Sequence, residues 1–81
     1  MRLDKFLKVS RVIKRRTVAN DACEAGRVSI NGKVAKPSTP VAVGDLVEIR
    51  FGAGTTRFEV VAVKENVRKE EASSMIRSLE S

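Results

Sequence analysis

The residues of this sequence that could do chemistry are cations, and most of them lie in its first half. The first 36 residues contain ten Lys/Arg against three Asp/Glu, a balance of +7, whereas the remaining 45 contain six against seven. Like charges repel, so such one-sided charge is a poor way to stabilise a fold and a good way to build a surface for a polyanion. The charge distribution therefore predicts a nucleic-acid partner.

The densest cluster is the segment 11–16, which places four cations within six residues. Cations at the end of a helix can serve only to complement the helix dipole, but this role does not explain the other basic residues of the same half. We therefore interpret the whole set as an RNA-binding surface, headed by arginines because their planar fork makes bidentate contacts with phosphate. The set consists of Arg2, Lys5, Lys8, Arg11, Lys14, Arg15, Arg16, Arg27, Lys33 and Lys36.

Other site chemistries find little support in the sequence. The chain has no His and a single Cys, Cys23. It therefore lacks the ligand spacing of a zinc site, cannot form an internal disulfide and has no histidine to activate the thiol. Asp4 lies among cations and is interpreted as an electrostatic brace or as a partner of the helix dipole at the N-terminal end of its helix. The three Phe sit in apolar patterns, which disfavours base stacking and favours recognition of RNA backbone and shape. We expect no enzyme, no cofactor and no metal.

Length and hydropathy predict one small domain that does not enter a membrane. Eighty-one residues are close to the size at which burial of a core begins to suffice without metals or disulfides. No apolar run approaches the roughly 20 residues of a membrane span, and the first residues lack the apolar core of a signal peptide. The expected location is the cytoplasm.

Two helices are predicted at the front of the chain. Leu3, Phe6 and Leu7 recur at helical spacing, and the pattern leaves open whether this helix ends near Ser10 or continues. A second helix is predicted over 17–25, with Thr17 as its N-cap and Gly26 just past its end. Its apolar face comprises Val18, Ala19, Ala22 and Cys23.

Short strands are predicted next, and a helix last. Asn31-Gly32 lies between two extended stretches and predicts a tight hairpin, because a type I′ turn needs positive φ at both central positions. Strands are expected over 46–51 and 57–63. The spacing of the last apolar residues predicts an amphipathic helix over 66–81. Its apolar residues are Ala72, Met75, Ile76 and Leu79.

Together these elements predict an α+β fold, with two N-terminal helices packed on a short, mainly antiparallel β-sheet and a C-terminal helix added. The expected division is a domain over 1–65 and the amphipathic helix over 66–81. Because both N-terminal helices must bury their apolar faces on the same sheet, we expect them to lie side by side. That arrangement would place Arg2, Arg16 and Lys36 on one face.

Several short motifs in fixed order resemble the S4 RNA-binding domain, and the resemblance covers about residues 2–51. The motifs are Arg2-Leu3-Asp4-Lys5-Phe6-Leu7, the basic run ending at Arg16, Thr17-Val18-Ala19, Ala25-Gly26-Arg27-Val28, Ile30-Asn31-Gly32 with Lys36, and Val43-Gly44-Asp45. The resemblance implies a small S4-like α+β fold that binds structured RNA.

Over its whole length, the turn at 50–52 and the tail at 69–72 included, the chain is similar to the bacterial RqcP family. This resemblance implies a non-catalytic factor of ribosome-associated quality control, which binds obstructed large subunits through large-subunit ribosomal RNA and P-site peptidyl-tRNA. With a NEMF-type partner protein, such a factor supports C-terminal alanine tailing of the stalled chain. The family's RNA contacts map onto Arg2 and Arg16, with phosphate contacts expected at Lys5, Lys8, Arg11, Lys14 and Arg15.

Three other interpretations remain open. The first is a ribosome-associated factor of the heat-shock type that recycles large subunits, although the basic C-terminal extension of that relative is lacking here. The second is a detached accessory domain of an RNA-modifying enzyme, and the third is a module that binds DNA or acidic protein. We expect a monomer associated with the large ribosomal subunit. Lys69, in the charge-balanced tail, is expected to matter little.

Overall fold

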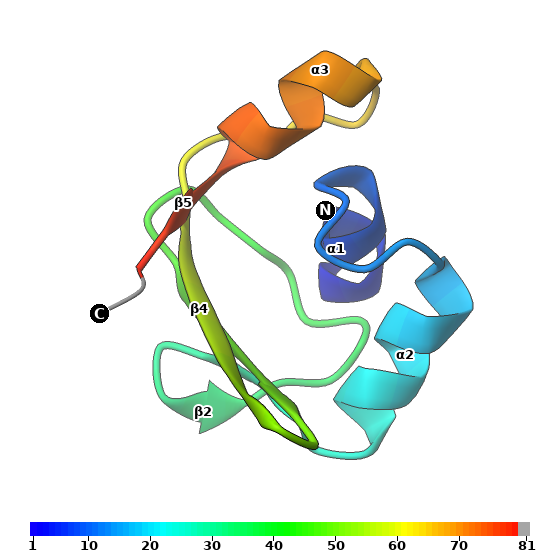
Figure 1. Cartoon of the computed structure of the whole chain (residues 1–81), viewed down its shortest axis with the longest axis vertical. Helices are drawn as coiled ribbons and strands as arrows, with labels where there is room; N and C mark the ends of the chain where they lie inside the picture. Colours follow the sequence, from blue (N-terminus) through cyan, green and yellow to red (C-terminus); the bar gives the residue numbers. More distant parts are fainter. Residues whose placement is uncertain (80–81) are drawn as a thin grey trace.

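Two short helices cover one side of a five-stranded antiparallel sheet in the computed structural model, which describes residues 1–79. Figure 1 shows α1 and α2 beside each other on that side, with α3 above α1. The sheet order is β2-β1-β3-β4-β5. The elements are α1 (Leu3–Val9), α2 (Arg16–Glu24), β1 (Val28–Ile30), β2 (Lys33–Val34), β3 (Leu46–Phe51), β4 (Gly54–Val60), α3 (Lys69–Ala72), the 3-10 helix η1 (Ser73–Met75) and β5 (Ile76–Ser78).

The first helix forms as predicted, and the structure shows where it ends. Leu3, Phe6 and Leu7 are all fully buried. The helix ends at Val9 with Ser10 as its C-cap, and Arg11 follows with a left-handed φ of 62°. Left-handed backbone stops helical hydrogen bonding and usually belongs to glycine, so an arginine here costs on the order of 1 kcal/mol.

The second helix begins one residue earlier than predicted, at Arg16. Its N-cap is Arg15, which makes no side-chain capping bond, so the prediction of Thr17 as the cap is wrong. Ala19 and Cys23 are buried, whereas Val18 is 49% exposed, so the apolar face is narrower than predicted. The small buried residues allow α2 to approach α1 closely.

The Asn31-Gly32 hairpin is confirmed, with φ of 51° at Asn31 and 84° at Gly32. The Asn31 side chain also donates to Asp45 at 3.2 Å and accepts from the Leu46 amide at 2.9 Å, which ties the turn to the start of β3. The predicted strand over 46–51 is confirmed as β3. The next strand, β4, starts at Gly54 rather than at 57, because its pairing with β3 continues up to the turn, and it ends at Val60 rather than at 63.

The amphipathic helix predicted over 66–81 is wrong for most of its described length. Only Lys69–Ala72 is α-helical, a 3-10 turn follows, and Ile76–Ser78 pairs with β4 as an edge strand. Ala72 and Met75 are buried, as an apolar face requires, but Leu79 remains 36% exposed. The otherwise free edge of β4 offers backbone hydrogen bonds, and a short segment gains more from them than from two further helical turns. Residues 80 and 81 lie outside the described residues.

One apolar cluster lies between the helices and the sheet. The rings of Phe6 from α1 and Phe58 from β4 stack with centroids 6.4 Å apart, and Met75 from the tail is fully buried in the same cluster. The C-terminal segment therefore contributes to the core. No helix within residues 1–79 is long and apolar enough to cross a membrane.

Met75 and Leu79 separate the observed tail from the predicted helix. Met75→Ala should lower the free energy of unfolding by about 2–5 kcal/mol, because it removes a fully buried side chain. Leu79→Ala should change it by no more than about 0.5 kcal/mol, since that side chain is partly solvated. Urea unfolding measures both variants. Equal losses of unfolding free energy in the two variants would contradict the strand and favour the predicted helix, in which both residues share one apolar face.

Candidate nucleic-acid interface

The carboxylate of Asp4 is buried where the N-terminal ends of α1 and α2 meet, and it gathers polar groups from both helices. The side chain is 3% exposed. Arg2 donates to it through Nε at 3.2 Å and Nη2 at 3.1 Å, and Asn20 donates through Nδ2 at 3.3 Å. The Lys5 amide donates at 2.7 Å, and Arg16 Nε lies 3.5 Å from Oδ2. Asp4 is therefore the brace that the sequence predicts.

The two arginines held by Asp4 still face solvent. The side chains of Arg2 and Arg16 are 50% and 47% exposed, although both contact the same buried carboxylate. Arg16 and Asn20 stand one helical turn apart on α2, so that both reach Asp4 from one face. A shallow hollow of about 300 Å³ lies beside this group and is lined by Asp4, Arg16, Thr17, Asn20 and Asp21. Two oriented guanidinium groups at such a place can contact one phosphate backbone.

The electrostatics of Asp4 keep its carboxylate charged. Burial by itself would raise the pKa of Asp4. The hydrogen bonds from Asn20 and the Lys5 amide, together with the charges of Arg16 and Arg2, lower it by more, so the pKa of Asp4 lies below its usual value. In contrast, burial, with smaller effects of Asp4 and Glu24, raises the pKa of Cys23 to about 11. Cys23 is thus a protonated core thiol at neutral pH.

The turn at 37–39 fixes the start of α1 beside this pair of arginines. The amides of Leu3 and Asp4 donate to the carbonyls of Thr39 and Pro37 at 2.9 and 3.1 Å. These bonds satisfy helix N-terminal amides that no side chain caps. Lys36 directly precedes the turn and is exposed, so it lies at the same end of α1 as Arg2.

The ten cations proposed from the sequence do not form one cluster. Lys8, Arg11 and Lys14 line a different hollow, beyond the C-terminal end of α1, and Lys5 pairs with Glu65 at 3.7 Å. Arg27 and Lys33 follow α2, whose length of roughly 13 Å separates them from Arg16. Arg15 is the exposed N-cap of α2. Arg2 and Arg16 are the pair that the structure brings together.

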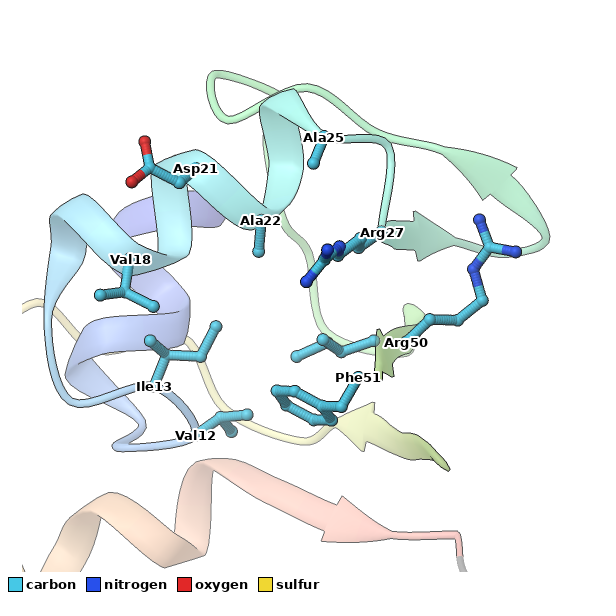
Figure 2. Close-up of a pocket in the computed structure, with 10 residues that line it drawn as sticks. Val12, Ile13, Val18, Asp21, Ala22, Ala25, Arg27, Arg50 and Phe51 are labelled. Carbon is cyan, nitrogen blue, oxygen red and sulfur yellow. The ribbon is translucent and has the colours of Figure 1, made fainter. Parts of the chain in front are cut away.

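Arg27 borders an apolar hollow of about 430 Å³ between α2 and the end of β3. Figure 2 shows Val12, Ile13 and Val18 on one side of it and Phe51 and Arg27 on the other. Phe51 is 48% exposed, whereas Phe6 and Phe58 are buried in the core. Arg27 thus lies among apolar side chains rather than beside Asp4.

Sequence reasoning missed two residues of this interface. Asn20 is not among the predicted site residues, although its spacing of four residues from Arg16 places both on one helix face. Lys69 is predicted to matter little, yet it lines the same hollow as Lys8, Arg11 and Lys14. No local sequence pattern predicts that Lys69 lines this hollow, because its position depends on the return of the C-terminal segment to the sheet.

Comparisons with known proteins agree with this architecture. A family model described as the S4 domain matches residues 1–47. The structure of the trimeric Heat Shock Protein 15 of Vibrio cholerae superposes with a TM-score of 0.88 at 33% identity, over 96% of this chain and 80% of that one. The solution structure of the hypothetical protein HP1423 gives 0.83 at 31% identity, over 100% and 99% of the two chains. The fold is that of an S4 domain protein, as the motifs predict.

Sequence relatives narrow the assignment further. A protein of Halalkalibacterium halodurans named RQC P-site tRNA stabilizing factor is 60% identical over 75 residues, which cover 93% of this chain and 85% of that protein. The protein of the same name from Bacillus subtilis is 52% identical, over 93% and 87%. A Heat Shock Protein 15 homologue of Aeromonas salmonicida is 37% identical, over 80% of this chain and 49% of that one. The chain belongs to the S4 domain family and, within it, to the RQC P-site tRNA stabilizing factors, the RqcP family.

Asp4→Asn tests the brace through the pH dependence of stability. At pH 7 the variant should lose about 1–3 kcal/mol of unfolding free energy, because charge-assisted hydrogen bonds to a buried carboxylate are removed. The folded pKa is lowered, so the contribution of Asp4 is full above its unfolded pKa of about 3.8 and is lost as pH falls through the folded pKa. Urea unfolding between pH 7 and pH 3 should therefore show the wild type and the variant converging in acid.

The exposed Glu70 provides the matched control for this series. Glu70→Gln removes one carboxylate that has no ion pair within the described residues and should leave the curve close to the wild type at every pH. A stability gap between wild type and Asp4→Asn that stays equally large at pH 3 would contradict the proposed role of the Asp4 charge.

Proposed function

We propose that this protein is a non-catalytic RNA-binding factor of ribosome-associated quality control, which binds the large ribosomal subunit and stabilises P-site tRNA there. The observation that carries the proposal is the pair of exposed guanidinium groups, Arg2 and Arg16, oriented by one buried carboxylate. Arginine side chains that are already held in place lose little conformational entropy when they bind, so a larger part of the free energy of each phosphate contact contributes to affinity. The name of the relatives supports tRNA as one ligand.

The chemistry of the site favours backbone recognition. The cations around α1 supply donors but no aromatic platform, which suits the phosphates and shape of folded RNA. We propose a helix of large-subunit ribosomal RNA and the backbone of peptidyl-tRNA as the two targets, bound by a monomer in the cytoplasm. In this proposal the protein holds peptidyl-tRNA in place while a NEMF-type protein directs the addition of C-terminal alanine residues.

A second function of the same class is recycling of blocked large subunits, as a factor of the heat-shock type. The structural likeness to Heat Shock Protein 15 favours this alternative. The two functions differ in their products. A quality-control factor is required for alanine tails on stalled chains, whereas a recycling factor is required for release of free subunits. Tail analysis in cells that lack the protein separates them.

Arg16→Ala tests the site, and Arg57→Ala is its matched control. Each variant removes one arginine and one carboxylate contact, because Arg57 pairs with Glu48 at 2.8 Å on the exposed sheet. Arg16→Ala should weaken co-sedimentation with large subunits carrying peptidyl-tRNA about ten- to a hundredfold, the cost of one charge-assisted contact. Asp4 keeps Arg2 and Asn20, so the thermal midpoint should fall by only a few degrees, roughly the effect of 1 kcal/mol in a small domain. Equal binding by both variants would rule out the Asp4 site.

Salt dependence measures how many phosphates the protein contacts. About five contacts should give a slope of roughly −3 to −5 for log K against log salt, because each neutralised phosphate releases condensed counterions. The double variant Arg2→Ala, Arg16→Ala should reduce the steepness by roughly 1.4–1.8, the share of two contacts. Binding to large subunits between 50 and 300 mM potassium chloride gives both slopes. A flat response in the wild type would mean that apolar or protein contacts dominate.

A further inference from the structure

A second basic site lies at the opposite end of α1 from Arg2 and Arg16. It is a hollow of about 850 Å³, lined by the end of α1, the segment that follows it and the residues that lead into the start of α3. Four cations contribute to it, Lys8, Arg11, Lys14 and Lys69, against the single acid Glu65. The charge of Glu65 is shared with Lys5, from which it lies 3.7 Å away. Within residues 1–79 none of the four cations has a salt-bridge partner.

One of the four cations, Arg11, occupies a position that local structure disfavours. Arg11 has a φ of 62°, where glycine is the residue of lowest cost. Lys69 begins α3, a helix of only four residues whose first turn already contains Glu70 and Glu71. The end of α1 does not explain an arginine at position 11, and Arg11 lines the same hollow as Lys69. Strained or disfavoured residues of this kind cluster at sites where a ligand is held.

The base of the hollow is anchored in the fold. Val9 and Val67, which line it, both pack against the apolar core. Its walls therefore come from two segments more than 50 residues apart that the core holds together. Asn66 adds an amide, which can donate to an oxygen acceptor.

We propose that this hollow is a second phosphate-binding site, which takes the sugar-phosphate backbone of a structured RNA. The proposal rests on the proposed function and extends it to the C-terminal segment, through Lys69 and Asn66. The length of α1, roughly 10 Å, separates the hollow from the Asp4 site, so one extended RNA surface can reach both. Cations that only complement the dipole of α1 would belong to its last turn, which includes neither Lys14 nor Lys69.

Arg11→Gly separates a structural role of Arg11 from a binding role. If the arginine is retained for RNA, glycine relieves the backbone, and the thermal midpoint should rise by about 2–5 °C while affinity for large subunits carrying peptidyl-tRNA falls about tenfold. A lower midpoint with unchanged affinity would mean that Arg11 serves the fold, and the proposal would fail.

Lys69→Ala and Arg68→Ala form a matched pair for the C-terminal wall. Both remove one exposed cation from neighbouring positions, but only Lys69 lines the hollow. Lys69→Ala should weaken subunit binding about fivefold and reduce the salt slope by roughly 0.7–0.9, as expected for one phosphate contact, whereas Arg68→Ala should stay within about twofold. Equal effects of the two variants would overturn the site. A fall in affinity with an unchanged salt slope would indicate a protein partner instead and would also overturn it.

Arg16→Ala, measured on the same subunits, distinguishes this inference from the proposed function. Weak binding by Arg16→Ala with normal binding by Arg11→Gly and Lys69→Ala would refute only the second site. Normal binding by all three variants would refute the proposed function as well. Weak binding by all three, with Arg68→Ala normal, is the result that we expect.

Discussion

The buried carboxylate of Asp4 is the constraint on which the arrangement of the two helices depends. An isolated buried charge is unfavourable, so the fold must bring donors to it, and it does so from both helices. Arg2 precedes α1, whereas Arg16 and Asn20 lie on α2, and the groups meet only when the helices pack side by side. The same contacts orient the two arginines toward solvent. Stability and site geometry therefore depend on one interaction.

This dependence explains how a small domain tolerates so much positive charge in its first half. Mutual repulsion among the cations destabilises the folded state. Most of these cations lie at the surface, where water and salt screen the repulsion. Close to the core, where screening is weakest, Asp4 supplies the opposite charge to Arg2 and Arg16. The turn at 37–39 adds backbone hydrogen bonds at the same end of α1. The strongest electrostatic compensation thus lies where the arginines approach each other.

Sequence patterns predict the elements that local rules determine. The stripe of Leu3, Phe6 and Leu7 identifies α1, and Asn31-Gly32 identifies the hairpin, because helical spacing and positive φ are properties of a few adjacent residues. The structure of the C-terminal segment does not follow from such local rules. Its apolar spacing fits a helix, but the free edge of β4 selects a strand, and that edge exists only in the folded sheet. The error over 66–81 is therefore a case of tertiary structure overriding a local pattern.

The candidate site likewise contains residues that the sequence predicts and one that it does not. Residue type and motif spacing single out Arg2, Arg16 and Asp4, and the geometry of their contacts follows from the packing of two predicted helices. The role of Lys69 could not be predicted, because its place beside Arg11 results from the tail pairing with β4. A chain that needed only to end α1 would place glycine after Ser10. This chain places Arg11 there, and Arg11 lines one hollow with Lys69. The proposed basic surface therefore extends to the C-terminal segment, although cations do not outnumber acids in that half of the chain.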